Sequence, residues 1–347
     1  MTKKRSILVT GGTGYIGSHT AVELIEKGYD VVILDNLSNS HAEVIDSIEK
    51  ITGVRPGFAN IDLNNKSAVQ EFLRIHPVEA IIHFAAFKAV GESVEKPLEY
   101  YRNNLVALIN LVELCRDQGI RNFVFSSSCS VYGEPDYLPI DEAAPVKPAQ
   151  SPYANTKKIG EDILRDASAV LNMNIVSLRY FNPVGAHASH QIGEYPLGTP
   201  LNLFPIVMQT AIGKRPGMKV FGQDYNTPDG SCIRDYIHVV DVARAHVVAI
   251  RRMLEGKCKN KYELFNLGTG TGLSVLEVIH AFEKSTGIKI NYSCVDRRAG
   301  DVEKVYADTS YANSELGWKA EHSLEDMIRS AWAWEQELQK KTMVGSK

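Results

Sequence analysis

A tyrosine and a lysine stand four positions apart in the stretch SPYANTKKIGE, residues 151–161. On a helix, Tyr153 and Lys157 would project from the same face, one turn apart. An ammonium beside a phenol favours the phenolate and lowers the pKa of the phenol from about 10 towards working pH, where the phenolate can act as a base. The same pattern also fits the exposed start of an ordinary amphipathic helix, with Pro152 near its first turn. The rest of the chain decides between the two interpretations.

Three serines end the apolar run NFVFSSS, residues 122–128. In an open α/β sheet, ligands bind at the carboxyl ends of the strands, where Ser128 could orient a hydroxyl group that is being oxidised. Serines at such a position can also simply end a strand by bonding to the backbone. Ser128, Tyr153 and Lys157 together form a Ser…Tyr-x-x-x-Lys set. We therefore predict them as the catalytic residues, given that the chain also binds a dinucleotide.

A glycine-rich turn follows the first apolar run, in LVTGGTGYIGSH. Gly11 permits the tight turn, Gly14 lets a pyrophosphate approach the backbone, and Gly17 allows the helix to pack closely on the strand. The N-terminus of that helix offers free N–H groups and a favourable dipole to phosphates. Asp35 ends the second strand at the expected interval of roughly 20 residues, where a carboxylate binds the adenosine ribose and repels a 2′-phosphate. The sequence therefore predicts a dinucleotide site that prefers NAD to NADP.

Buried strands alternate with amphipathic helices through the first half of the chain, which indicates a parallel sheet covered on both faces. Two helical segments, SHTAVELIEKG and NNLVALINLVELCRDQG, each end in a glycine that suits a helix C-cap. The predicted strands are SILVT (6–10), DVVILD (30–35), AIIHFAA (80–86), NFVFSSS (122–128) and NIVSLRYFN (174–182).

The alternation weakens after residue 182. Residues 183–205 predict a long loop, and long loops on an α/β scaffold are usually functional. Residues 262–270 predict a strand returning to the sheet, and residues 323–341 a closing amphipathic helix. We therefore predict an α/β fold with two domains. A doubly wound, parallel-sheet Rossmann domain comprises residues 1–182 and about 233–270, and a smaller mixed α/β substrate domain comprises about 183–232 and 271–340.

Charge and cysteine content narrow the class of protein. The formal net charge is −3 over 347 residues, which gives no electrostatic reason to expect nucleic acid or a membrane as a partner. The most apolar runs are too short to cross a bilayer, and AIIHFAAFKAV carries His83 and Lys88. The five cysteines are scattered without a C-x-x-C pair, which favours a cytoplasmic location over disulfides or structural zinc. No histidine pattern predicts a metal site.

The chain resembles the extended short-chain dehydrogenase/reductase superfamily and, within it, the UDP-galactose 4-epimerase family. The resemblance extends over residues 6 to 335 and includes stretches far more specific than the superfamily's shared motifs, notably RYFNPVGAH and RDYIHVVD. The other matching stretches are TGGTGYIGSHT, LDNLSNS, HFAAFKAVGESVEKPLEYYRNN, FSSSCSVYGEP, SPYANTKK, DGSCIRDYIHVVD, NLGTGTGLSVLEV and RRAGDVEKVYAD.

This resemblance implies an isomerase that epimerises C4 of UDP-hexoses through a transient 4-keto sugar, with tightly bound NAD that is not consumed. Tyr153 would remove the proton of the sugar 4-hydroxyl, Lys157 would support the phenolate, and Ser128 would orient the hydroxyl. The enzyme would grip the UDP, so that the sugar can turn between the two hydride transfers. Family members usually form homodimers through two helices, here around residues 100–116 and 153–168.

The family's binding residues map onto matching positions of this chain. Cofactor contacts are implied for Gly11, Gly14, Tyr15, Ile16, Gly17, Asp35, Asn36, Asp62, Leu63, Phe84, Ala85, Ala86, Lys88, Asn103, Tyr153, Lys157 and Phe181. Substrate contacts are implied for Ser128, Tyr153, Asn182, Asn202, Leu203, Val220, Phe221, Arg234, Arg298, Asp301 and Val305. By residue type alone, Lys88 also fits an ordinary exposed lysine, and Arg298 fits a surface ion pair with Asp296 or Asp301.

Two positions depart from the family's pattern. Cys129 follows the serine where alanine is more common, which makes it a candidate for thiol sensitivity. Val305 stands where family members carry either a large tyrosine or a small residue. Because valine is nearer in volume to the small residues, the resemblance implies room for an N-acetyl group. It therefore predicts activity on UDP-GlcNAc and UDP-GalNAc in addition to the plain hexoses.

Other functions on the same fold are the alternatives: a UDP-pentose or UDP-uronate 4-epimerase, a dehydratase, an alcohol dehydrogenase or an NAD-sensing regulator. A 4,6-dehydratase needs an added acid/base pair, usually Asp-Glu, beside the serine, whereas this chain has Cys129 and Ser130 there. A non-catalytic regulator typically lacks the tyrosine or the lysine, and this chain keeps both. An alcohol dehydrogenase would release reduced cofactor on each turnover, which absorbance would detect.

Overall fold

A large parallel sheet dominates the N-terminal half of the computed structural model, which describes residues 4–298 and 300–344. The strand order is β10-β6-β5-β4-β1-β2-β3, and neighbouring strands are parallel throughout. The strands are β1 (Ser6–Thr10), β2 (Asp30–Asp35), β3 (Gly57–Asn60), β4 (Ala80–His83), β5 (Asn122–Ser128), β6 (Asn174–Tyr180) and β10 (Tyr262–Leu267). The order reverses between β1 and β4, and that switch point is where open α/β sheets bind ligands.

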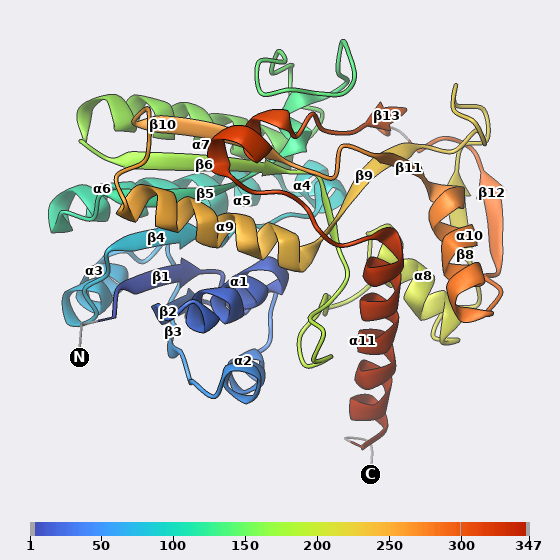
Figure 1. Ribbon diagram of the computed structural model, residues 1–347, viewed down its shortest axis with the longest axis horizontal. Coiled ribbons are helices and arrows are strands. Elements are labelled where there is room, and N and C mark those ends of the chain that lie inside the picture. The colour runs from blue at the N-terminus through green and yellow to red at the C-terminus, as the bar shows by residue number, and fades with distance from the viewer. Residues whose placement is uncertain (1–3, 299, 345–347) are drawn as a thin grey trace.

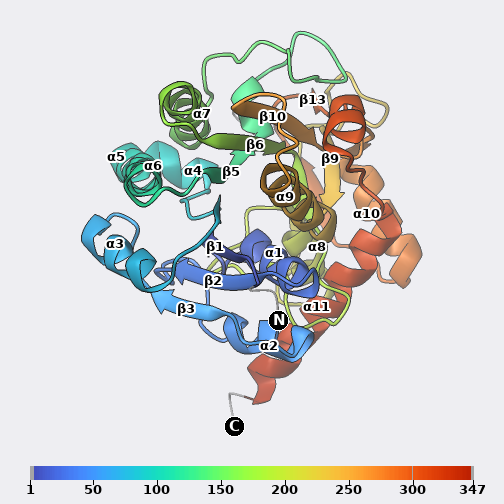
Figure 2. The same ribbon diagram turned by 60° about the vertical axis from the view of Figure 1, so that its left-hand side comes forward.

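Helices cover both faces of this sheet, as Figures 1 and 2 show. Ile7 and Val9 of β1 belong to an apolar cluster with α1 (Tyr15–Glu26), α2 (Val44–Thr52) and α9 (Val239–Leu254). Leu8 lies in a second cluster, with α3 (Lys66–Ile75), α6 (Ala107–Gln118) and α7 (Pro152–Val170). Neighbouring residues of a strand point to opposite faces, so a fully apolar strand is buried on both sides. The predicted doubly wound α/β fold is confirmed.

The predicted strands and helix ends agree with the structure apart from a few local differences. Gly28 and Gly119 take positive φ values of 87° and 71° at the ends of α1 and α6, as their positions predicted. The strand predicted for residues 80–86 ends at His83, because the next three residues leave the sheet and line a cleft. The short strand β3 was not predicted, because none of its four residues is fully buried and the apolar signal is weak.

Several short elements lie beside the carboxyl ends of the strands. The helices α4 (Val90–Glu95) and α5 (Pro97–Tyr101) lead through a π-helical segment, η1 (Arg102–Val106), into α6. Inside η1, the buried Asn104 amide accepts a hydrogen bond from the Phe87 N–H at 2.8 Å and donates to the Phe87 carbonyl at 3.0 Å. A 3₁₀ turn, η2 (Cys129–Tyr132), directly follows β5. These elements position the residues that come after β4 and β5.

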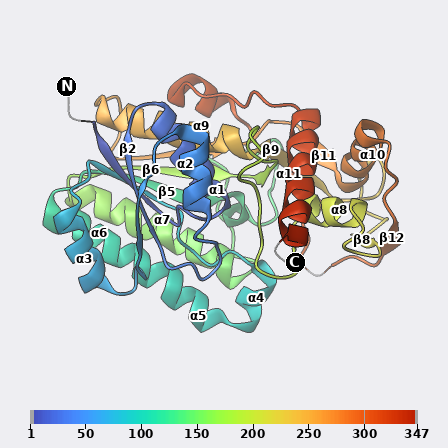
Figure 3. The ribbon, with the colours of Figure 1, turned by 90° about the horizontal axis from the view of Figure 1, so that it is seen from below.

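The second region is built from shorter strands and three helices. Its sheets have the orders β11-β9-β13, with β7 paired to β9, and β12-β8. The elements are β7 (Asn182–Val184), α8 (Leu203–Ala211), β8 (Met218–Phe221), β9 (Ile233–His238), β11 (Gly272–Ser274), α10 (Val275–Thr286), β12 (Tyr292–Val295), β13 (Lys304–Val305) and α11 (Leu324–Val344). The short η3 (Ala312–Leu316) instead packs with α9 and β10 beside the large sheet. Figure 3 shows α8, α10, β8 and β12 gathered at one end of the molecule, beside α11. One apolar cluster joins α8, α10 and α11.

The chain crosses between the two regions more than once. Residues 185–202, most of the predicted loop, are irregular between β7 and α8. Within the range 233–270, α9 and β10 pack with the large sheet, whereas β9 belongs to the second region. The division into two domains by residue ranges stays a prediction.

Candidate functional site

A cleft of about 2100 Å³ lies at the carboxyl ends of the large sheet, between that sheet and the second region. Its lining includes the glycine turn, the ends of β4 and β5, the start of α7, the irregular segment before α8, and residues on both sides of β13. Every residue predicted above as a catalytic, cofactor or substrate contact lines this one cleft. The structure thus brings the predicted residues together, and their roles stay predictions.

The glycine turn fits a dinucleotide. Gly11 has a φ of +69°, and a Cβ there would lie 2.7 Å from the Ala85 nitrogen; at Gly17 it would lie 2.2 Å from the Gly11 oxygen. At Gly14, the N-cap residue of α1, an added Cβ would meet only the Gly11 oxygen within 4 Å. The start of α1 has no side-chain cap, so its N-terminus is available to phosphate.

Asp35 is held firmly at the edge of that turn. One carboxylate oxygen accepts hydrogen bonds from the Leu37 N–H at 2.9 Å and the Ser40 hydroxyl at 3.0 Å, and the other accepts from the Thr13 N–H at 3.2 Å. The side chain is 8% exposed and lines the cleft. The carboxylate thus also stabilises the loop that follows β2, a role that the sequence did not indicate.

The three predicted catalytic residues meet on the floor of the cleft. Ser151 caps α7 by accepting from the Ala154 N–H at 3.2 Å, and this places Tyr153 in the first turn and Lys157 one turn later. The Lys157 ammonium donates to the Ser126 carbonyl at 2.7 Å and lies 5.9 Å from the centre of the Tyr153 ring. Ser128, at the end of β5, also lines the cleft, and its hydroxyl lowers the pKa of Tyr153.

Burial dominates the ionisation of this pair. It raises the pKa of Tyr153 to about 12 and lowers the pKa of Lys157 to about 8, because each group loses water that would stabilise its charged form. Burial outweighs any lowering of the phenol pKa by Lys157 in this structure, so the effect of the ammonium on Tyr153 stays a prediction. The two groups are close, but the ammonium is directed towards the Ser126 carbonyl.

On the substrate side, charged residues that line the cleft lie close to one another. Arg298 donates to Asp301 at 2.8 Å, and Arg234 lies 3.8 Å from the same carboxylate. The Arg298 guanidinium is also 5.3 Å from the centre of the Phe221 ring. The ion pair between Arg298 and Asp301 that residue type allowed is thus present, and both of its members line the cleft.

Glu194 is a site residue that the sequence analysis missed. Its carboxylate accepts a hydrogen bond from the Asn202 amide at 2.8 Å and lies 3.5 Å from the Lys88 ammonium. It therefore joins a predicted substrate contact to a predicted cofactor contact, and Lys88 is more than an ordinary exposed lysine. Glu194 is the only Asp, Glu, Lys or Arg between residues 180 and 213. This isolated charge is the feature of the sequence that could have identified it as a site residue.

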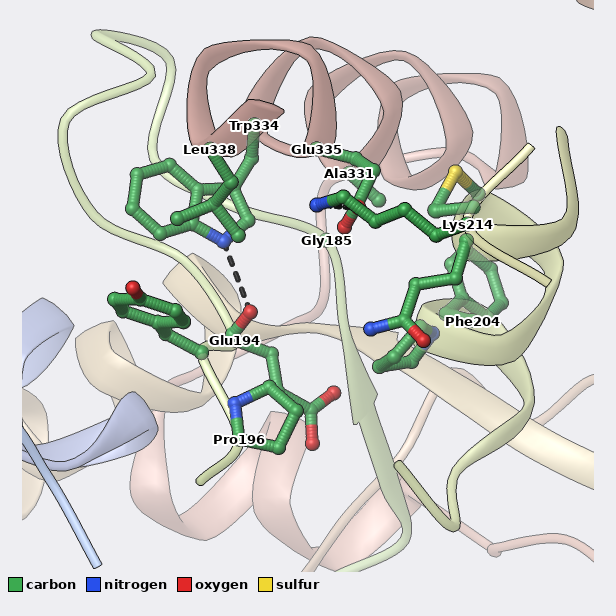
Figure 4. Close-up of a pocket in the computed structure, with 13 residues that line it drawn as sticks. Gly185, Glu194, Pro196, Phe204, Lys214, Ala331, Trp334, Glu335 and Leu338 are labelled. Carbon is green, nitrogen blue, oxygen red and sulfur yellow. Dashed lines mark hydrogen bonds and ion pairs between the residues drawn. The ribbon is translucent and has the colours of Figure 1, made fainter. Parts of the chain in front are cut away.

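A smaller cavity of about 80 Å³ lies behind the segment that carries Glu194, next to α8 and α11. In Figure 4, the Trp334 indole N–H donates to the Glu194 carbonyl at 2.9 Å. Tyr195 stacks on His41 with 4.0 Å between ring centres, and Lys214 pairs with Glu335 at 2.7 Å. Contacts from α11 and from the loop after β2 thus fix this segment over the cleft.

The two departures from the family pattern lie together. Val305 is 7% exposed in an apolar cluster with Val131 and Phe181, and Cys129 packs against that cluster. Burial raises the pKa of the Cys129 thiol to about 12. The expected thiol sensitivity of Cys129 is not supported, because a thiol at this pKa forms little thiolate.

Within residues 4–298 and 300–344, no group of three or more His, Cys, Asp or Glu residues is arranged to hold a metal ion. No helix in that part of the chain combines the length and apolar character that crossing a membrane requires.

Comparison with known proteins gives consistent results. The model of the family described as GDP-mannose 4,6 dehydratase matches residues 8–331. A UDP-glucose 4-epimerase from Bacillus subtilis (strain 168) is 50% identical over 331 residues, 95% of this chain and 96% of that protein. A crystal structure of UDP-glucose-4-epimerase from Stenotrophomonas maltophila, with bound NAD and formylated UDP-arabinopyranose, is 46% identical with a TM-score of 0.94, covering 97% of this chain and 99% of that one. The enzyme from Bifidobacterium longum, in complex with NAD+ and UDP, is 45% identical with a TM-score of 0.91, covering 96% and 98%.

Proposed function

The chain belongs to the UDP-glucose 4-epimerase family of extended short-chain dehydrogenases/reductases and catalyses NAD-dependent epimerisation at C4 of UDP-hexoses; we propose the residue roles below and a range that includes the N-acetylated hexoses. One observation carries the residue roles: Ser128, Tyr153 and Lys157 line the same cleft as the glycine turn. The match to a dehydratase family model fits the shared superfamily. Cys129 and Ser130 cannot supply the acid/base pair of a dehydratase.

In this proposal, Tyr153 transfers the proton. Its phenolate takes the proton of the sugar 4-hydroxyl, and its phenol returns a proton to the 4-oxygen at the end of the cycle. NAD, when bound beside the glycine turn, would supply the transfer of a hydride from and back to C4 of the sugar. Ser128 orients the 4-hydroxyl. Because burial opposes the phenolate, the positive charge of Lys157 close by is what makes this base usable.

The substrate is held by its nucleotide. Asn182, Arg234 and Arg298 bind the diphosphate, and a guanidinium is well suited to such an anion. Asp301 binds the uridine ribose, Asn202 and Leu203 contact the sugar and the uracil side, and Val220 and Phe221 flank the uracil. With all strong contacts on the UDP, the sugar is free to turn and present either face.

The range of substrates depends on Val305. A valine leaves more of the cleft open than a tyrosine would, so an acetamido group at C2 has room. A coupled assay of the purified protein with UDP-galactose and UDP-GalNAc tests this directly. Val305→Tyr should suppress the acetylated substrate selectively, by about 1–3 kcal/mol of discrimination, whereas Val305→Ser should keep both activities. A wild-type protein that is inert towards UDP-GalNAc would contradict the proposal.

We also propose a homodimer formed through α6 and α7. Leu98, Val106 and Ile109 are 79%, 40% and 42% exposed along the stretch from α5 to α6, and exposed apolar residues that cluster indicate an interface. Light scattering should show a dimer that Val106→Asp with Ile109→Asp converts to a monomer. Val54→Asp, an equally exposed position after α2 (43%), is the control and should remain a dimer.

A cytoplasmic location is part of the same proposal. All five cysteines are free thiols in the structure, and unpaired cysteines are typical of a reducing compartment.

A further inference from the structure

A buried ion pair lies behind the catalytic floor. The carboxylate of Glu161 on α7 accepts two hydrogen bonds from the Arg179 guanidinium of β6, at 2.8 and 2.5 Å. The Ser127 hydroxyl donates to the same carboxylate at 2.5 Å. Both charged residues are only 2% exposed. A pair this deeply buried is a poor source of net stability, because desolvation offsets the attraction, so its presence calls for another explanation.

Each member of this cluster adjoins a predicted catalytic residue. Glu161 lies four positions after Lys157, one turn further along α7. Ser127 directly precedes Ser128 on β5. The Arg179 guanidinium lies 4.6 Å from the centre of the Tyr132 ring, which belongs to the η2 turn after Ser128. The pair thus links α7, β5 and η2, the three elements that position Ser128 and Lys157.

We propose that Glu161 and Arg179 are positioning residues of the epimerase, and that the charge of Glu161 keeps Lys157 protonated during turnover. This inference rests on the proposed role of Lys157. The carboxylate fixes the spacing between Lys157 and Ser128, while its negative charge offsets the burial of the ammonium. Arg179 holds the carboxylate in place through two hydrogen bonds.

The other groups around Lys157 stay neutral near neutral pH. Burial lowers the pKa of His83 on β4 to about 3, and Cys129 is a neutral thiol. Burial raises the pKa of Tyr153 and of four further phenols, namely Tyr100, Tyr132, Tyr180 and Tyr262. From β9, Arg234 and Asp235 act on Cys129 in opposite directions. Burial lowers the pKa of Lys157 to about 8 and Glu161 opposes that change, so Glu161 is the anion that favours the ammonium.

Three variants separate charge from geometry, with turnover of UDP-galactose measured against pH. Glu161→Gln keeps the length but leaves the Arg179 charge unopposed, so deprotonation of Lys157 and Tyr153 becomes easier. The whole pH–rate profile should move to lower pH, by roughly one unit. Glu161→Asp keeps the charge, so the rate should fall while the profile stays in place. Glu161→Gln combined with Arg179→Gln removes both charges. Lys157 still lacks its nearby carboxylate, so the profile should stay at lower pH than the wild type, shifted by less than in Glu161→Gln.

A purely structural role predicts lower rates without movement along the pH axis. A Glu161→Gln profile that superposes on the wild type, or a double variant with the wild-type profile, would overturn the proposal. If Glu161→Gln does not fold, the other two variants decide: a Glu161→Asp profile in place together with a double variant shifted to lower pH supports the proposal, and any other combination contradicts it. Lys157→Ala distinguishes a failure of the proposed role of Lys157 from a failure of the inference on Glu161. A normal rate in that variant would remove the proposed role of Lys157 itself, whereas a low rate with an unmoved Glu161→Gln profile removes only this inference.

Discussion

The floor of the cleft and its substrate-facing rim are stabilised in opposite ways. On the floor, Lys157 is 5% exposed and its supporting ion pair, Arg179 with Glu161, is 2% exposed on regular elements. On the rim, the side chains of Arg298 and Lys88 are 56% and 52% exposed, and their partners Asp301 and Glu194 come from irregular segments. Both regions line or support the same cleft.

This difference matches two different tasks. Breaking a buried pair costs about 3–5 kcal/mol, so the floor holds its groups at fixed distances, as proton and hydride transfer require. An exposed pair contributes about 0–1 kcal/mol, so a rim arginine can leave its carboxylate for a diphosphate at little cost. The floor is therefore expected to control rate and pH dependence, and the rim to control affinity.

Tyr153→Phe should lower turnover more than any change on the rim. A small effect on turnover would contradict the distinction between floor and rim. Loss of the only hydroxyl that can transfer the proton should lower turnover by roughly 10² to 10⁴. The ring still packs in the same place, so melting temperature and NAD binding should be unchanged. The test is a coupled assay with UDP-galactose, alongside calorimetric binding of NAD. A variant with most of the wild-type rate would remove Tyr153 from its role.

Lys157→Met should lower turnover by at least about tenfold and move the remaining activity to higher pH, because Tyr153 loses a stabilising charge. The same change should raise stability. The pKa of Lys157 falls from 10.5 to about 8 on folding, so below pH 8 the folded protein bears the cost of a buried cation, about 2–4 kcal/mol.

The sign of this effect fixes its pH window. A lysine whose pKa is lowered by folding binds more protons in the unfolded state, so the wild type gains stability as pH rises from about 8 to 10.5. The stability advantage of Lys157→Met should therefore be greatest below pH 8 and vanish towards pH 10.5. Chemical unfolding at several pH values measures it. A variant less stable than wild type at neutral pH would show that Lys157 stabilises the fold.

The contrast between floor and rim also explains which features could be predicted from the sequence. Apolar strands, glycine turns and the Tyr-x-x-x-Lys spacing are local patterns. They predicted the large sheet correctly, and they selected residues that the structure brings together on the floor. The pKa of Tyr153 could not be predicted from spacing, because it depends on how much water the folded cleft excludes. The contact between Glu161 and Arg179 joins positions 18 apart, on α7 and β6, and no local pattern reports such a pairing.

On the rim, one pair joins positions that are even further apart in sequence. Lys88 and Glu194 are separated by 106 positions and meet only because an irregular segment folds over the cleft. One signal was available at each site: a charged residue in an otherwise uncharged setting, such as Arg179 within the apolar strand β6 and Glu194 within its loop. An isolated charge of this kind needs a partner when it is buried.

Arg298→Ala tests the rim, where substitution should weaken UDP binding and leave stability nearly unchanged. Its exposed pair with Asp301 contributes little, so unfolding free energy should change by less than about 0.5 kcal/mol. Loss of a guanidinium that binds diphosphate should weaken UDP binding roughly tenfold, as a charge-assisted hydrogen bond contributes about 1.5–3 kcal/mol. Arg297→Ala is the matched control. That neighbour pairs with Asp224 at 2.8 Å and is not among the residues that line the cleft, so UDP titration should give the wild-type affinity.

Cys129→Ala should have the smallest effect, although the residue adjoins Ser128 on the floor. With a pKa of about 12, the thiol is ionised to only roughly one part in 10⁴ at pH 8, so it contributes no charge to the site. Turnover should stay within about twofold of wild type. For the same reason, iodoacetamide should alkylate Cys129 slowly in the folded protein and rapidly after unfolding, as peptide mass spectrometry would show. Fast alkylation of the native protein with loss of activity would mean that the floor admits water at this position, and the contrast between a sealed floor and an adaptable rim would not hold there.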